Sequence, residues 1–317
     1  MSAVPNVSIG AEGYVGIAIE DTPGTYEAPT KFFPIRSESL SWTQDTNWRR
    51  VIRGTVDPIG AIAGNGNVEG DLDVELLPGV LPYFLLCARG TLDTHDDGYE
   101  YTPTHGALAP NTMSVTVVRN GEAFGYIGCV VSSMSFSEDN AMATSNFSLL
   151  GMREESVAVP AAPVYSDDEP FGAGTWSLQV PTDTQIFDAD AFSFEVDDSG
   201  EVQNRLKDEL GAQFVSFGER NTSVSIDRDF QDRAEYDAFK SLTSRDITVR
   251  VGSSATRYCE FKMPVGIQDS NEVNLSGVGD LIRSSITYQG VHDADTGGAF
   301  SIIVGTDEVV PGVGGGT

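Results

Sequence analysis

The acidic side chains include the residues of this sequence best spaced to do chemistry. Glu69, Asp71, Asp73 and Glu75 alternate with other residues along one segment. Because successive side chains of a β-strand point to opposite faces, this spacing predicts four carboxylates on one face of one strand. A shorter row, Asp227 and Asp229, follows later in the chain. The pattern fits a paired-carboxylate catalytic site or a solvated sheet face that borders either bulk water or the inside of an assembly.

No other group of residues has the spacing of a catalytic or metal site. The aspartates at 188, 190, 197 and 198 lack the D-x-D-x-D-G pattern of a calcium loop, and we interpret them as surface acids. The three histidines are isolated, and neither H-E-x-x-H nor G-x-S-x-G is present. Cys87, Cys129 and Cys259 have no C-x-x-C spacing and are predicted to be small buried side chains. We therefore expect no enzyme activity, no metal and no cofactor.

The charge of the chain is extreme and spread along its length. Its 47 acidic and 19 basic residues give a net charge of −28, and only four residues are lysine, namely Lys31, Lys207, Lys240 and Lys262. This composition is typical of proteins that work in very high salt, where the screening length falls to about 3 Å. We predict a halophilic, haloarchaeal host, with an ordinary acidic protein as the alternative. Either way, binding to nucleic acid by phosphate neutralisation is not expected.

No feature of the sequence predicts a membrane segment or a secretory signal. The chain has no apolar run of about 18 residues, the least that predicts a transmembrane helix. Residues 1–13 lack the basic and apolar regions of a signal peptide.

The elements that carry the acids belong to a unit that occurs twice. At the start of 221–251, apolar residues alternate with polar ones, which predicts a strand. Apolar residues then recur every three positions after a capping box of Asp232 and Glu235, which predicts a helix, and the alternation of a strand follows. The same order occurs at 67–118, with a short apolar helix at 81–88. Aligning the two units places Asp227 and Asp229 within the row of alternating acids from Glu69 to Glu75, which we call the acid row.

Two further segments align between the units. The last strand of each unit aligns without a gap, with Ser145 on Ser284, and the preceding segment aligns with Phe136 on Ile267. A duplication explains these matches better than a chance likeness of two β-rich regions. The expected division is a first arm at 1–36, a first domain at 37–156, a linker at 157–190, a second domain at 191–293 and a last arm at 294–317.

The N-terminal region carries a family resemblance. Gly10 to Ala18 with Pro23, followed by Phe33 to Leu40, resembles the start of major tail tube proteins of long-tailed, siphovirus-type viruses. The resemblance implies a mainly β chain with two tandem tail-tube-like β-sandwich or barrel domains, each with one flanking α-helix and a long loop between early strands. In that family, six such domains close into a ring, and rings stack into a tube that conducts DNA.

Under this resemblance the charged residues gain expected roles. A row of carboxylates on the lumen face would repel phosphate, so the predicted lumen-lining residues are Glu69, Asp71, Asp73, Glu75, Asp227 and Asp229. The two long loops, 43–66 and 197–220, together with the N-terminal arm, are expected to make the contacts between stacked rings, and the basic residues of the loops are expected to form ion pairs there. Their predicted contact residues are Trp48, Arg49, Arg50, Arg53, Arg205, Lys207 and Arg220.

The duplication also predicts the assembly. Two fused domains per chain require three chains for a ring, so we expect a homotrimer with pseudo-sixfold symmetry, and a hexamer with one decorating domain is its rival. The resemblance implies further contacts with tape measure, terminator and baseplate proteins, DNA passing without specific binding, no membrane, and assembly in the host cytoplasm into the virion tail. The other function classes are a surface-layer or pilus component and a glycan hydrolase.

Overall fold

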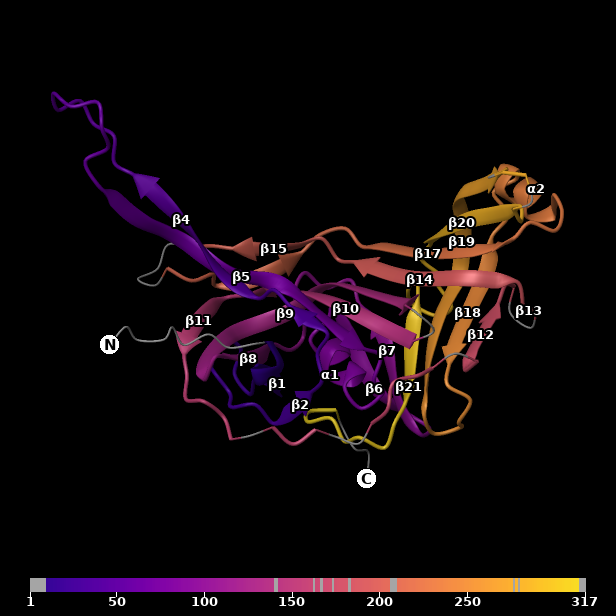
Figure 1. Cartoon of the computed structure of the whole chain (residues 1–317), viewed down its shortest axis with the longest axis horizontal. Helices are drawn as coiled ribbons and strands as arrows, with labels where there is room; N and C mark the ends of the chain where they lie inside the picture. The colour runs from indigo at the N-terminus through magenta and orange to yellow at the C-terminus, as the bar shows by residue number, and fades with distance from the viewer. Residues whose placement is uncertain are drawn as a thin grey trace.

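The protein consists mainly of antiparallel strands with two short helices (Figure 1). The structure is a computed structural model that describes residues 10–139, 142–161, 163–165, 168–172, 174–181, 184–205, 210–275, 277–278 and 280–313. The prediction of a mainly β chain is confirmed.

The first half of the chain contains the 3₁₀ turn η1 (Gly10–Glu12), β1 (Tyr14–Ile19), β2 (Lys31–Phe33), β3 (Ser37–Glu38), β4 (Ser41–Trp48), β5 (Ala61–Glu75), α1 (Leu81–Leu86), β6 (Gly90–His95), β7 (Gly98–Pro103), β8 (Met113–Arg119), β9 (Glu122–Asp139), β10 (Met142–Gly151) and β11 (Arg153–Ser156). The second half contains β12 (Trp176–Gln179), β13 (Gln185–Ile186), β14 (Ala189–Asp197), β15 (Gly200–Gln203), β16 (Phe214–Phe217), β17 (Asn221–Asp229), α2 (Ala234–Lys240), β18 (Arg245–Val251), β19 (Tyr258–Asn274), β20 (Arg283–Gly290) and β21 (Ser301–Gly305).

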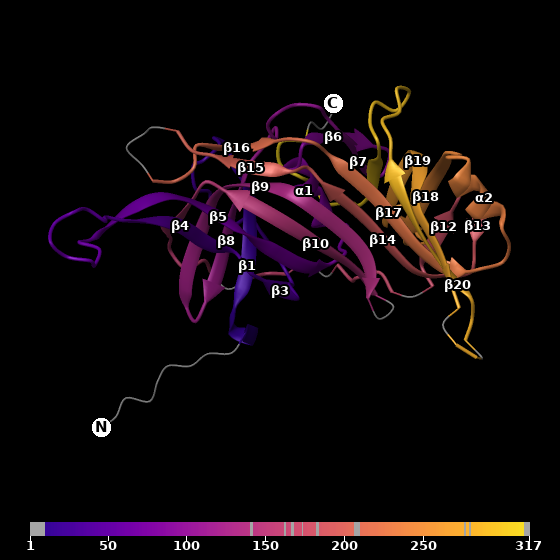
Figure 2. The same ribbon diagram turned by 90° about the horizontal axis from the view of Figure 1, so that it is seen from above.

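One long antiparallel sheet runs through both halves of the chain. Its strands follow the order β3 and β4, β5, β10, β9, β14, β17, β20, β19. Figure 2 shows several of these strands side by side. Within this sheet the two halves meet at β9 and β14, which pair from Ser133 with Asp197 to Ser137 with Ser193. We call this set of strands the long sheet.

The order of pairing within each half is the same. In the first half the order is β4, β5, β10, β9, and in the second half it is β14, β17, β20, β19. A β-bulge lies at matching places. The pairing of β9 with β10 skips Ser132, and the pairing of β19 with β20 skips Asp269. Met134 and Asn271, two positions after the skipped residues, are both buried, so the two long strands are irregular at the same point.

The hydrogen-bond register corrects one alignment made from the sequence. Phe136 lies opposite Ser145, and Val273 lies opposite Ser284. Phe136 therefore corresponds to Val273, and its predicted match with Ile267 is wrong. The two long strands share little side-chain pattern, because buried apolar residues of the first are replaced by polar ones in the second.

The two halves share one hydrophobic core. It lies between the long sheet and the strands beneath it, and α1 is buried in it on every side. Phe136 of the first half lies with its ring centre 4.6 Å from that of Phe261 and 6.3 Å from that of Phe194, both of the second half. By contrast α2 lies at the surface, with only Ala238 buried. The core therefore joins the halves in addition to the strand pairing.

The expected arms and linker take part in the sheets. In the segment 1–36, β1 pairs with β8 and its Val15 and Ile17 are fully buried. In the segment 157–190, β12 pairs with β18, and in the segment 294–317, β21 pairs with β19 and β7. Within the described residues the long sheet does not close on itself, so the chain alone forms no barrel.

The two expected long loops are hairpins with different courses. β4 and β5 continue past the sheet as a projecting ribbon, whose last ladder pair is Trp48 with Ala61 and whose tip spans 49–60 (Figure 1). β15 and β16 pair with each other and fold back over the first half, where Val215 and Phe217 pack on Val130. Ser199, with φ at 45°, lies in the turn from β14 into this hairpin.

Candidate functional site: an acidic sheet face with two free edges

One face of the long sheet carries a field of carboxylates. In each strand the apolar residues point into the core, and the intervening residues form the opposite face, which we call the acidic face. Its acidic residues are Glu69, Asp71, Asp73, Glu75, Glu195, Asp197, Asp227, Asp229 and Glu272. The six predicted lumen-lining residues thus lie on one face of one sheet.

The carboxylates are arranged so that they do not oppose one another across strands. Asp71 lies between Ser39 and Ser148, and Asp73 lies between Ser37 and Asn146. The other acids likewise have neutral cross-strand neighbours, except Asp229, whose neighbour on β20 is Arg283. Because like charges directly opposite each other destabilise a sheet, this spacing lets one face hold a dense negative charge.

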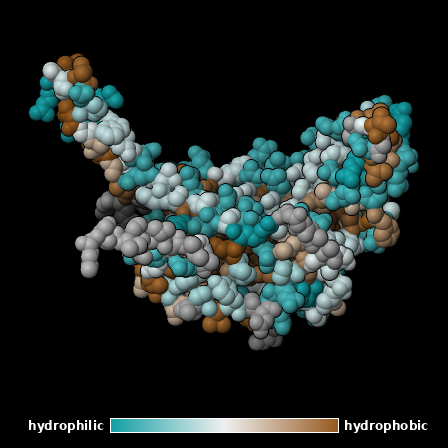
Figure 3. Space-filling view, in the orientation of Figure 1, coloured by the Kyte–Doolittle hydropathy of each residue, from teal (hydrophilic) through white to brown (hydrophobic). Residues whose placement is uncertain are grey.

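Hydroxyl groups of the same face donate hydrogen bonds to two of the carboxylates. Ser148 Oγ donates to Asp71 Oδ1 at 2.6 Å, and Thr43 Oγ1 donates to Glu69 Oε1 at 3.0 Å. The upper side of the molecule in Figure 3 is hollowed and mostly hydrophilic between its two raised ends, which Figure 1 identifies as the β4–β5 hairpin and the α2 region. The acidic face is thus a preformed surface with fixed charge.

A buried ion cluster fastens the junction of β9 with β14. Asp198 Oδ1 accepts from Arg89 Nη2 at 2.7 Å and from Arg220 Nε at 2.6 Å, and its backbone N–H donates to the Ser132 carbonyl at 2.9 Å. The Asp198 side chain is 3% exposed. Arg220 Nη2 also donates to the Arg89 carbonyl at 2.6 Å. The cluster ties both halves together beside the sheet.

The long sheet ends in two edges that have no partner strand among the described residues. One edge is formed by β3 and β4, which pair only with β5. The other is the last part of β19, which pairs with β20 on one side, while β18 reaches only to Gly266 on the other. Val273, in this part of β19, is 37% exposed. Unpaired edges of this kind are ready to add a further strand.

The predicted contact residues separate into two groups. Trp48, Arg49, Arg50 and Arg53 are exposed on the projecting hairpin, beside the exposed apolar residues Ile52 and Val56 at its tip. Arg205 is exposed and its guanidinium lies 5.3 Å from the centre of the Phe214 ring. Lys207 lies outside the described residues. Arg220 is engaged in the buried cluster with Asp198, so we leave it out of the contact set below.

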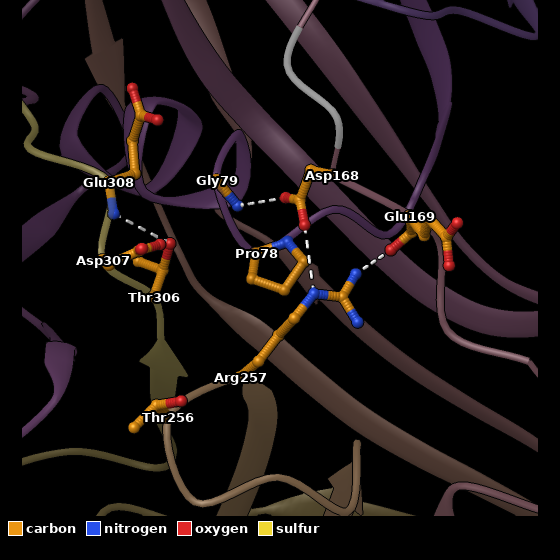
Figure 4. Close-up of a pocket in the computed structure, with 9 residues that line it drawn as sticks. All are labelled: Pro78, Gly79, Asp168, Glu169, Thr256, Arg257, Thr306, Asp307 and Glu308. Atoms are coloured by element: carbon orange, nitrogen blue, oxygen red, sulfur yellow. Dashed lines mark hydrogen bonds and ion pairs between the residues drawn. The ribbon is translucent and has the colours of Figure 1, made fainter.

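A pocket beside the start of α1 shows no catalytic arrangement of its described residues. It has a volume of about 850 Å³ and lies between the start of α1 and the segments around Asp168, Arg257 and Glu308 (Figure 4). Asp168 accepts from the Gly79 N–H at 2.9 Å and from Arg257 Nε at 3.1 Å, and Arg257 also donates to the Glu169 carbonyl. Lys31 Nζ lies 2.8 Å from Glu308 Oε2. These pairs hold the chain segments together and engage the charged groups of Asp168, Arg257, Lys31 and Glu308.

The described residues contain neither a cluster of metal ligands nor a membrane-spanning helix. No group of three or more acidic, histidine or cysteine side chains is placed to hold a metal ion in the described ranges. No helix among those residues is long and apolar enough to cross a membrane.

Comparison with protein families agrees with the architecture. Residues 10–290 match the family model described as phage tail tube protein. The chain belongs to the phage tail tube protein family. It is therefore a structural protein whose place is in the virion tail, where it assembles with itself and with other tail proteins. Comparison with individually curated proteins gives no match.

Sequence reasoning missed three acids of the face. Glu195 and Asp197 lie on β14, and Glu272 lies on β19 beyond the bulge. The alternation of Phe192, Phe194 and Val196 gave a usable signal for β14. The polar stretch around Glu272 gave none, because both faces of that strand carry polar side chains.

Proposed function

We propose that the chain is the major subunit of a siphovirus-type tail tube whose rings are homotrimers. The observation that supports this most directly is the long sheet, in which two four-stranded units already join edge to edge within one chain. Each ring would contain three chains, and each chain would contribute its two predicted domains, 37–156 and 191–293, so that six domains surround the lumen. The rings stack, and the tube conducts the viral DNA.

The size of such a ring suits a DNA conduit. Each chain supplies eight strand positions to the long sheet, so three chains supply about 24. At about 4.8 Å per strand, the circumference is roughly 115 Å and the backbone diameter roughly 37 Å before strand tilt widens it. That opening admits a DNA duplex.

The acidic face suits the inner surface of this conduit. Carboxylates repel phosphate, and their charge acts without base contacts, so DNA of any sequence would pass without being retained. We assign the lumen lining to the nine acids of this face, which include the six predicted from the sequence.

The projecting β4–β5 hairpin is our candidate for the contact between stacked rings. Its tip exposes Ile52 almost completely beside Arg49, Arg50 and Arg53, which combines apolar surface with positive charge on a strongly acidic chain. The tape measure, terminator and baseplate proteins would meet the ends of the tube. Assembly in the cytoplasm of a halophilic host, and the absence of any catalytic role, complete the proposal.

Electron microscopy of the purified protein in molar salt tests the assembly. We expect tubes or rings with an open centre. Flat sheets would indicate a surface layer instead, and monomers would remove the basis for the proposal.

Charge reversal tests the lumen assignment. Asp71→Lys with Asp73→Lys and Asp227→Lys should give tubes that retain duplex DNA in a nuclease-protected form, with retention that falls steeply as salt rises. The matched control replaces the same residues by Asn, which removes the charge without reversing it. Retention that is nuclease-sensitive would place these residues on the outside of the tube.

A further inference from the structure

The junction between β9 and β14 gives a template for the contact between chains. Both members of that junction have a counterpart that lies at an unpaired edge, because β19 corresponds to β9 and β4 corresponds to β14. We infer that β19 of one chain pairs antiparallel with β4 of a second copy, in the register that β9 and β14 use within the chain. The inference rests on the proposed tail tube function and deepens it by naming the partner strand and its register.

The register follows from the strand pairings within the chain. Met134 and Asn271 occupy matching places, because they lie opposite Phe147 and Ile286 of the two aligned last strands. Within the chain, Met134 pairs with Val196.

The partner position on β4 is found in the same way. Val196 pairs with Thr222, and Trp42 pairs with Val68. Thr222 and Val68 match because each lies four residues before the matched pair Ile226 and Leu72. Asn271 should therefore pair with Trp42 of the next chain. The adjacent pair is Glu272 with Ser41, and Val273 then lies beside Leu40 in the break between β3 and β4.

The side chains in this register are compatible on both faces. On the core side, Val273 is 37% exposed in the single chain, whereas its counterpart Phe136 is fully buried by the junction. Pairing with the next chain would cover Val273 beside Leu40. On the acidic face, Glu272 would meet the neutral Ser41, as Glu195 meets Ser135 within the chain. A shift by one residue would turn every side chain to the wrong face.

The second copy approaches an edge that is already held in shape. The Leu40 carbonyl accepts from Arg119 Nη2 at 2.7 Å and from Tyr126 Oη at 2.9 Å, and Arg119 also forms a bidentate pair with Glu38. These bonds fix β3 and β4 against the strands below. β4 bulges beyond Gln44, where the projecting hairpin begins, so the contact is confined to the start of β4. Such a head-to-tail contact leaves open edges unless it closes into a ring.

Disulfide cross-linking tests the register. In the variant Ser41→Cys with Glu272→Cys, the two cysteines lie at opposite ends of the long sheet of one chain and meet only between chains. The matched control, Ser37→Cys with Glu272→Cys, keeps the same face but is four residues out of register. The native cysteines are buried, and burial raises the pKa of their thiols, so they do not compete.

Oxidation of assembled rings should link the first variant into covalent trimers on a non-reducing denaturing gel, with the control at least ten-fold less linked. Equal linking of both variants, or rings by microscopy with no linking of the first, would overturn the register and leave the tail tube function standing. Wild-type chains that form no rings at all would overturn the function itself.

Hydrogen exchange of the unmodified protein gives a second measurement that needs no variant. Peptides covering 37–44 and 267–275 should exchange about ten-fold or more slowly in rings than in dissociated chains. Equal exchange in the two states would contradict the pairing.

Discussion

The buried cluster of Asp198 with Arg89 and Arg220 gives the sharpest prediction about the single chain. Asp198→Asn leaves two arginines, with side chains 7% and 10% exposed, around one neutral amide. Removing one partner from a buried ion pair costs about 3–5 kcal/mol, because the remaining charge stays desolvated without compensation. We expect the free energy of unfolding to fall by that amount, and the junction of β9 with β14 to open first.

The matched control is Asp190→Asn. Asp190 Oδ2 lies 2.7 Å from Arg283 Nη2, but the two side chains are 44% and 55% exposed. An exposed pair contributes at most about 1 kcal/mol, and salt reduces its contribution further. Urea unfolding of both variants at the same salt concentration measures the difference. If Asp198→Asn costs no more than Asp190→Asn, the cluster does not hold the junction and the reasoning is refuted.

Four more predictions concern other parts of the molecule. Glu20 is buried and accepts hydrogen bonds from the Gly24 and Gly128 N–H groups and from the Thr112 and Ser114 hydroxyls. Glu20→Ala should therefore lower the free energy of unfolding by more than about 2 kcal/mol. The control Glu122→Ala, at an exposed position, should change the free energy of unfolding little, and equal losses in the two variants would contradict the prediction. Replacing 50–59 by Asn-Gly should leave rings that microscopy shows unstacked, and tubes of normal length would exclude the hairpin as the ring contact. Dialysis to about 50 mM salt should dissociate the rings as the screening length exceeds 10 Å, and rings that remain intact by light scattering would contradict the halophilic proposal. Burial raises the thiol pKa of Cys87, Cys129 and Cys259. Mass spectrometry should therefore find no alkylation by iodoacetamide at pH 8 in the folded protein and three adducts in urea. Adducts in the folded protein would show that the core opens.

The sequence predicted the parts of the fold that local periodicity controls. The acid row and the helix at 81–88 follow from alternation and from an apolar run, and the structure has β5 and α1 at those places. Aligning Leu76 with Phe230 also makes Asp73 correspond to Asp227. The strand pairing supports this match, because Asp73 and Asp227 lie opposite Asn146 and Ser285, which are matching positions of the two aligned last strands.

The remaining features depend on contacts that local pattern does not contain. The match of Phe136 with Val273 comes from the strand register, and the polar stretch around Val273 carries no apolar pattern that would show it. Arg89 and Asp198 are far apart in the chain, so the buried cluster that removes Arg220 from the predicted contact set was not predictable from either segment. The different courses of the two hairpins also come from tertiary packing, since only the second rests on Val130 and Leu150.

The mass of a single ring tests the central claim most directly. Native mass spectrometry of rings released from tubes in a volatile salt should give three chains of 33.9 kDa, because each chain supplies two joined four-stranded units to a wall of six. A ring of six chains would contradict the account, since it would mean that only one unit of each chain lines the lumen.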